Sequence, residues 1–140
     1  LSIVRPMTAD GTKLRPEWEG AFDRVLVDAP CSGLGVIRKK PDIRYKNPKE
    51  LAQLPLVQRA ILENASGYVR PGGTLVYSTC TVLPEENEDV TGDFLDKHPE
   101  FEPVRTAFPL PVGPCPGQVT LWPQRHGTDG FYICRMRRKD

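Results

Sequence analysis

The chain has 140 residues and a formal net charge of +1 at pH 7. This length suits a single domain that can bury a hydrophobic core without cross-links. Hydrophobic residues make up 39% and charged residues 26%, a balance that excludes a disordered chain. No apolar run approaches the roughly 20 residues that a membrane helix needs, and no signal peptide is visible, so we expect no membrane partner.

The cysteines and histidines give no sign of a metal site. None of the four cysteines forms a C-x-x-C pair, and the two histidines are not spaced to complete a zinc site. We therefore expect reduced thiols, a cytoplasmic protein and no bound metal. The chain begins with leucine, inside what reads as an extended segment, so we expect a fragment of a longer protein.

Two predicted strands flank a predicted helix. Phe22–Asp28 and Gly73–Ser78 have the nearly continuous apolar character of strands buried on both faces. Between them, Asn47 is a candidate helix N-cap with a proline at the next position, and apolar residues then recur at helical spacing. Pro55 should kink this helix or begin its main part. Strand, helix and strand predict a parallel βαβ unit and an α/β fold.

The second half of the chain predicts one more helix and a final strand. Residues 83–98 read as a helix in which Val90, Phe94 and Leu95 face the core. A short strand is expected over 101–105, and residues 106–118, rich in proline and glycine, read as loop. The alternating segment 130–137 predicts the last strand.

Cysteines follow both strands of the predicted βαβ unit. Asp28, Pro30 and Cys31 come after the first strand, and Cys80 comes after the second. Ligands bind beyond the carboxyl ends of the strands in an open parallel sheet, and amides at such places stabilise a thiolate. If the two strands are neighbours, both thiols face one crevice. A buried cysteine is more often a small hydrophobe, and Cys134 inside the last strand fits that description.

A thiolate opposite a carboxyl group suits chemistry on a pyrimidine. The thiolate can add to C6 while the acid hydrogen-bonds N3, and C5 then becomes electron-rich enough to attack a methyl donor. A basic run follows the first cysteine, with six Lys or Arg and one Asp between Arg38 and Lys49. Such a run is often only a solvated face. Beside a site it suits a polyanionic substrate.

Three segments together resemble the Sun-type RNA cytosine-C5 methyltransferases, closest to the bacterial type that modifies small-subunit ribosomal RNA. They are DRVLVDAPCSGLGVIRKKPDIRYK, GGTLVYSTCTVLPEENE and GTDGFYICRMR. Either cysteine motif alone would be weak, whereas the pair is specific. The resemblance covers nearly the whole chain. It implies the C-terminal portion of a Rossmann-like methyltransferase sheet, with parallel strands and an antiparallel last strand, that uses S-adenosyl-L-methionine and binds RNA, with ribosomal RNA as the implied substrate.

The resemblance also implies roles for individual residues. Cys80 matches the nucleophile, Cys31 the second cysteine that helps to release the product, and Asp28 the acid near cofactor and base. Asp28, Pro30 and Asp10 are the residues implied for the cofactor, although the turn sequence around Asp10 is also an ordinary one. The basic residues implied for RNA are Arg38, Lys39, Lys40 and Arg44.

The family's glycine-rich cofactor loop and its N-terminal RNA-binding region have no counterpart here, and Gly33 and Gly35 read as a turn beside the site. We therefore expect residues 1–140 to be a partial catalytic domain that is inactive alone and can self-associate through an exposed sheet edge. Two alternatives stay open. One is a DNA cytosine-C5 methyltransferase, in which Cys31 would be the nucleophile, and the other is an RNA-binding module without catalysis.

Overall fold

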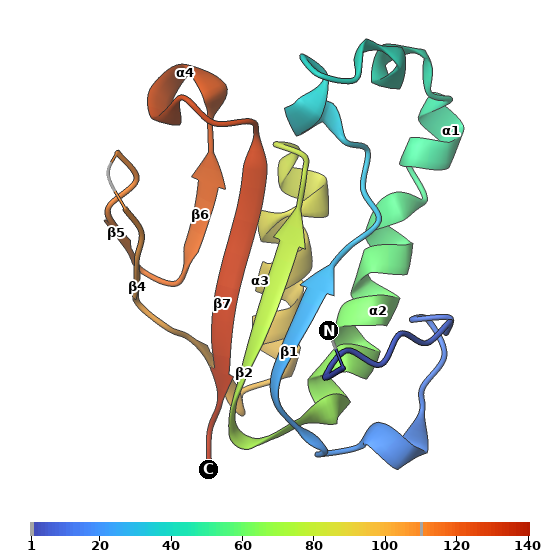
Figure 1. The fold of residues 1–140 in the computed structure, drawn as a ribbon, viewed down its shortest axis with the longest axis vertical. Helices are drawn as coiled ribbons and strands as arrows, with labels where there is room; N and C mark the ends of the chain where they lie inside the picture. Colours follow the sequence, from blue (N-terminus) through green and yellow to red (C-terminus); the bar gives the residue numbers. More distant parts are fainter. Residues whose placement is uncertain (1, 110) are drawn as a thin grey trace.

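The computed structural model describes residues 2–109 and 111–140 and is built around one twisted sheet. Its strands follow the order β1-β2-β7-β3, and β6 also pairs with β7 (Figure 1). β1 and β2 are parallel, whereas β7 runs antiparallel to β2, β3 and β6. The predicted α/β class, with parallel strands and an antiparallel last strand, is therefore confirmed. The strands are β1 Phe22–Asp28, β2 Val69–Thr79, β3 Phe101–Pro103, β6 Gln118–Leu121 and β7 Phe131–Arg138.

The connection between β1 and β2 is helical and breaks where the sequence predicts. The short helix α1 (Pro48–Leu51) begins after Asn47, whose side chain accepts a hydrogen bond from the Lys49 amide. The main helix α2 (Leu54–Tyr68) has Pro55 in its first turn, where a missing amide costs nothing. The helix ends at Tyr68, and β2 starts at once, earlier than the predicted strand, because the segment before Gly73 pairs with β1 across a register shift.

Two helices cover one face of the sheet. The helix α3 (Glu88–Lys97) follows a 3-10 turn, η4 (Pro84–Glu86), and lies behind the strands in Figure 1. Val90 and Phe94 are buried and Leu95 packs against the core, as predicted. The core also holds Cys134, which is fully buried in β7. It contains Val27, Leu62, Val69, Leu75, Tyr77, Val90, Phe94, Phe101, Tyr132 and Met136.

The prediction that the first strand is buried on both faces is wrong in this structure. Leu26 in β1 is 68% exposed, although its neighbour Val27 is buried. β1 is an edge strand whose only strand partner among the described residues is β2, and the helices reach only one of its faces. Alternate residues of β1 therefore face outward.

The segment before the last strand is more regular than predicted. Residues 106–118 contain a two-stranded sheet, β4 (Thr106–Ala107) and β5 (Pro114–Cys115), closed by a turn at Gly113 with φ +70°. The loop prediction for this segment is therefore wrong in part, because short pairings in a Pro-rich segment carry little periodicity. β6 and α4 (Pro123–His126) follow. The remaining 3-10 turns are η1 (Pro16–Trp18), η2 (Leu34–Val36) and η3 (Pro41–Tyr45).

No helix in the described part of the chain is both long enough and apolar enough to cross a membrane.

Candidate active site

The carboxyl ends of β1 and β2 lie side by side, because the strands pair in parallel with Asp28 opposite Ser78. The Ala29 amide donates a hydrogen bond to the Ser78 carbonyl over 2.9 Å, and the Ser78 hydroxyl donates to Asp28 over 3.3 Å. The structure thereby joins the two segments that the sequence predicts as one site. In Figure 1 this site lies at the upper edge of the sheet, below the loops that carry α1 and α4.

Two thiols meet at this edge. The Sγ atoms of Cys31 and Cys80 lie 3.3 Å apart, and both side chains are half-buried. Burial, and then the hydrogen bond to Cys80, raise the pKa of Cys31 to about 12. Cys31 is therefore a protonated thiol at neutral pH and can donate its S–H to the Cys80 sulfur.

Three side chains fix the backbone of the loop that carries Cys31. The Gln58 amide nitrogen donates to the Pro30 carbonyl over 2.9 Å. The Glu86 carboxylate accepts a hydrogen bond from the Ser32 amide, and the Lys46 ammonium donates to the Ser32 carbonyl, both over 2.9 Å. Gln58 and Glu86 also bond to each other over 2.8 Å. Polar groups around Cys31 are thus held by residues from α2, η4 and the segment after η3.

The segment that carries Cys80 is tied to the same buried network. The Ser32 and Thr81 hydroxyls are 2.8 Å apart, which links the two cysteine loops directly. Asn87 accepts from the Thr79 hydroxyl over 2.6 Å and donates to the Thr81 carbonyl over 3.1 Å. The Tyr77 hydroxyl donates to the Glu86 carbonyl over 2.7 Å. These bonds satisfy buried polar groups and fix the positions of the two loops that carry the sulfurs.

Close backbone packing completes the scaffold. The Gly35 amide donates to the Cys80 carbonyl over 3.0 Å, and the Gly130 amide donates to the Gly35 carbonyl over 2.8 Å. A Cβ atom on Gly35 would lie 1.9 Å from the Gly130 oxygen, so only glycine fits there. The predicted turn around Gly33, with φ +79°, thus also anchors the start of β7.

The basic run lies beside the site, and part of its charge is balanced. Arg38 and Lys39 both form ion pairs with Asp129, which precedes β7. The Arg44 guanidinium lies 5.6 Å from the centre of the Tyr45 ring, and Tyr45 is 78% exposed. The positive surface is therefore smaller than the sequence predicts, but it includes an exposed aromatic ring.

Asp10 is not brought to the thiols. Its carboxylate accepts hydrogen bonds from the Thr12 amide and hydroxyl over 3.0 and 2.7 Å, and it pairs with Lys13. These bonds form a local turn and lower the pKa of Asp10. The following Gly11 carbonyl accepts from Asn64 of α2, so this turn packs on the helix, on the right of the sheet in Figure 1.

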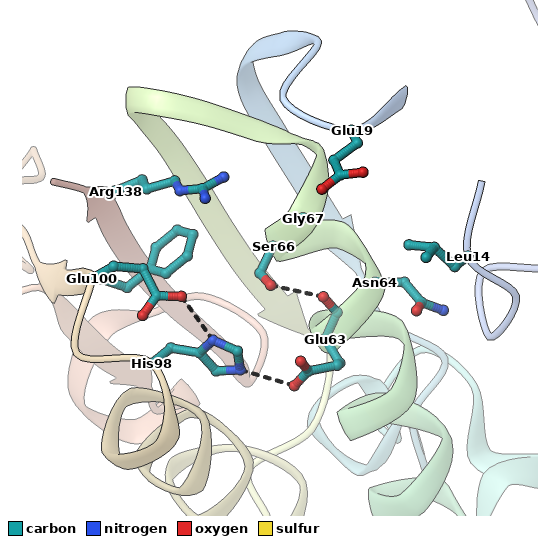
Figure 2. Close-up of a pocket in the computed structure, with 10 residues that line it drawn as sticks. Leu14, Glu19, Glu63, Asn64, Ser66, Gly67, His98, Glu100 and Arg138 are labelled. Atoms are coloured by element: carbon teal, nitrogen blue, oxygen red, sulfur yellow. Dashed lines mark hydrogen bonds and ion pairs between the residues drawn. The ribbon is translucent and has the colours of Figure 1, made fainter. Parts of the chain in front are cut away.

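A separate hollow of about 380 Å³ lies at the other end of the molecule, and Figure 2 shows the side chains around it. His98 lies between Glu100 and Glu63, 2.9 Å from each. Gly67, also in its lining, comes two residues before Val69, which pairs with Phe22 at the start of β1, whereas the thiols follow the opposite end of the strand pair. The six steps from Phe22 to Asp28 span roughly 20 Å at about 3.3 Å per residue. This hollow does not belong to the thiol site.

The sequence does not identify several residues that support the site. Glu86 reads in the sequence only as an acid in the first turn of a helix, yet it is 3% exposed and binds the Cys31 loop. Its position after Pro84, five residues past Thr81, is a weak signal at best. Lys46 reads in the sequence only as part of the basic run, and Gln58 and Asp129 carry no signal, because their partners are distant in the sequence.

Comparison with known proteins identifies the family of this chain. A family model described as "16S rRNA methyltransferase RsmB/F" matches residues 3–137. The chain belongs to the RsmB/F family. This is a family of S-adenosylmethionine-dependent methyltransferases, and the matched segment contains both cysteine motifs.

Relatives of this RsmB/F chain are found among bacterial proteins and solved structures. "Probable ribosomal RNA small subunit methyltransferase B" of Bacillus subtilis (strain 168) is 46% identical over 99% of this chain and 33% of its own length. The crystal structure of PH0851 is 38% identical over 97% of this chain and 31% of that one, with a TM-score of 0.85. The structure of NSun6 from Pyrococcus horikoshii "with SFG" is 31% identical over 82% of this chain and 29% of its own chain, with a TM-score of 0.64.

The chain spans about one third of the length of the Bacillus relative that it matches. PH0851 therefore resembles this chain in sequence as well as in fold.

Proposed function

We propose that this RsmB/F chain carries the cysteine pair of an enzyme that methylates C5 of a cytosine in small-subunit ribosomal RNA. The observation that carries the proposal is the 3.3 Å separation of the Cys31 and Cys80 sulfurs, beside Asp28 at the ends of two parallel strands. The name of the Bacillus relative supports the ribosomal substrate. A ribosomal substrate also supports a cytoplasmic location.

Cys80 is the proposed nucleophile. Its sulfur forms a bond to C6 of the cytosine, and the electron pair of the C5–C6 double bond moves into the ring. Asp28 is proposed to donate a hydrogen bond from its protonated carboxyl group to N3 of the ring and so to support the charge that develops there. Its position at the end of β1, hydrogen-bonded by Ser78 of β2, supports this role. The addition makes C5 nucleophilic. S-adenosylmethionine, when bound, supplies the methyl group for C5.

Cys31 is the proposed release group. In this role Cys31 acts as a thiol, and its burial favours the protonated form by raising its pKa. Release requires that water takes the C5 proton, that the electron pair of that C–H bond restores the C5–C6 double bond, and that the bond between Cys80 and C6 breaks. The Cys80 sulfur then leaves as a thiol, and Cys31 regains a proton from solvent. The Cys31 S–H, at 3.3 Å, can protonate the departing Cys80 sulfur. The Thr79-Cys80 motif, matched within the family segment, argues against a DNA methyltransferase in which Cys31 would be the nucleophile.

The residues present fit part of a cofactor site. The side chains of Asp28 and Pro30 are exposed, and Gln58 holds the Pro30 carbonyl in place. Both residues can therefore line a cofactor site beyond the end of β1. Asp10 is also exposed and keeps its proposed role toward the cofactor. The structure of NSun6 "with SFG", an S-adenosylmethionine analogue, supports the same cofactor.

RNA is proposed to bind over the basic run beside the thiols. Lys40 and Arg44 are exposed, and Tyr45 offers a ring on which a base can stack. The side chains of Arg38 and Lys39 are each 66% exposed, so they can turn from Asp129 to phosphate. Self-association through the outer edge of β1 stays a prediction.

Mass spectrometry and bisulfite sequencing of a 16S rRNA transcript test the function. The complete protein with S-adenosylmethionine should leave one 5-methylcytosine, and Cys80→Ser should leave none. A methyl group on another atom or another base would contradict the proposal. Cys115→Ser is the matched control, since Cys115 lies in β5 away from the site and should retain activity.

A further inference from the structure

A second, smaller pocket adjoins the thiol site on the side of β7. It has a volume of about 240 Å³ and lies between the loop after β1 and α4. Gly35 and Val82 form part of its lining, together with the apolar side chains of Ile37 and Trp122. Arg38 and Gln124 add polar groups to the same lining.

The pocket is linked to the reacting cysteine through backbone. Gly35, in its lining, donates its amide to the Cys80 carbonyl over 3.0 Å. Val82 follows Cys80 by two residues, and Asp129, also in the lining, directly precedes Gly130, which bonds to Gly35. A molecule in this pocket would therefore lie next to a substrate held at the thiols. The pocket itself contains no thiol.

The lining suits a flat, partly polar ring. Trp122 is half-buried, and its backbone is fixed because its amide donates to His126 Nδ1 over 2.9 Å at the start of α4. Aromatic side chains and arginine planes are the usual partners of unstacked RNA bases, and Gln124 offers both a donor and an acceptor to a base edge. Ligand pockets commonly measure about 300–1,000 Å³, so this smaller one suits a single ring system.

Charge favours the same occupant. Arg38, which lines the pocket, begins the basic run, and Lys39 and Lys40 continue it on the exposed surface. Phosphate groups on either side of a base in the pocket would meet these cations. Arg38 and Lys39 already pair with Asp129, but no ion pair of Lys40 is found among the described residues, so a partner without phosphates would leave Lys40 unmatched. The pocket and its charged surroundings together match one nucleotide of a single strand.

We propose that this pocket, the Trp122 pocket, binds an unpaired base that neighbours the target cytosine in the RNA. The inference rests on the proposed function, because it needs an RNA strand at the thiols. It adds a site for sequence preference: a base that fills the pocket fixes the position of the strand, and the next nucleotide then reaches Cys80. Trp122 is a positioning residue, since it touches the neighbour and not the reacting ring.

A binding cycle with abasic RNA tests the pocket. The probe is a short single-stranded RNA centred on the cytosine that bisulfite sequencing identifies, with each neighbouring base removed in turn. Equilibrium affinity is measured without cofactor for the complete protein and for Trp122→Ala. Stacking of one base corresponds to roughly 5- to 150-fold in affinity. We expect Trp122→Ala and one abasic position each to cause such a loss, and their combination to cause no further loss.

Controls separate this inference from folding and from the proposed function. Trp122→Phe should retain most of the affinity, and Trp18→Ala should retain all of it, since Trp18 packs on Tyr68 at the far end of the sheet. The proposal would be overturned if the loss of RNA affinity from Trp122→Ala added to the loss from every abasic position. Equal RNA affinity for Trp122→Ala and the wild type would overturn it as well. Absence of 5-methylcytosine would instead overturn the proposed function. The same cycle on a single-stranded RNA of mixed sequence, with one abasic position at a time, would then report on the pocket alone.

Discussion

Replacing Gly35 by alanine should destabilise the protein more than an ordinary core substitution. The new Cβ would lie 1.9 Å from the Gly130 oxygen and 2.8 Å from the Cys80 oxygen, and both are backbone atoms that cannot rotate away. Overpacking typically costs about 1–3 kcal/mol. Two backbone hydrogen bonds of Gly35 must also lengthen, at about 1 kcal/mol each. The expected loss is about 3–5 kcal/mol of the free energy of unfolding.

Urea unfolding of Gly35→Ala, followed by circular dichroism, measures this loss as a lower midpoint at unchanged slope. Gly92→Ala is the matched control. Gly92 lies in α3 with no atom within 4 Å of its added Cβ, so alanine should stabilise by roughly 0.5–1 kcal/mol through helix propensity. A loss below about 1 kcal/mol for Gly35→Ala would refute the claim that this contact anchors the cysteine loops to β7.

Two further predictions concern charge. Replacing Arg38, Lys39 and Lys40 by alanine should weaken RNA binding and reduce its log–log salt slope by up to about 2, at roughly 0.7 for each phosphate that these cations neutralise. Asp129→Asn should strengthen RNA binding, because it frees two of these cations. An unchanged salt slope in both variants would mean that the basic run is only a solvated face. Burial alone would lower the pKa of His98, but its bonds to Glu100 and Glu63 outweigh burial and raise the pKa above 6.5. The stabilisation from protonated His98 is then full below pH 6.5 and disappears as the pH rises through the folded-state pKa, so thermal unfolding of His98→Gln should lack this decline.

Local sequence patterns predict the framework of the site well. The apolar runs, the cap at Asn47 and the position of Pro55 each depend on neighbours within a few residues, so the βαβ unit follows from the sequence. Parallel pairing then requires the ends of β1 and β2 to meet, which puts Cys31 and Cys80 together. The edge exposure of Leu26 could not follow, because it depends on what else pairs with β1.

The rest of the site depends on contacts between distant residues. Glu86 and Ser32 are 54 positions apart, and the run of acids around Glu86 reads as a solvated face. Asp129 balances Arg38 from 91 positions away, so the charge of the basic run is overestimated from its own sequence. Trp122 lines its pocket only because β6 and α4 fold back beside β7, and such short elements have almost no periodic signal.

The central claim is that Cys80 attacks the base and Cys31 releases it. Its most direct test is a denaturing gel of the complete protein with labelled 16S rRNA and S-adenosylmethionine. Cys31→Ala should give a slow-migrating covalent complex, because addition proceeds and the departing sulfur lacks its neighbouring thiol at 3.3 Å. Cys80→Ala should give neither complex nor methylation. A covalent complex with Cys80→Ala would contradict the assignment, and RNA binding by the wild type without methylation would indicate a binding module instead.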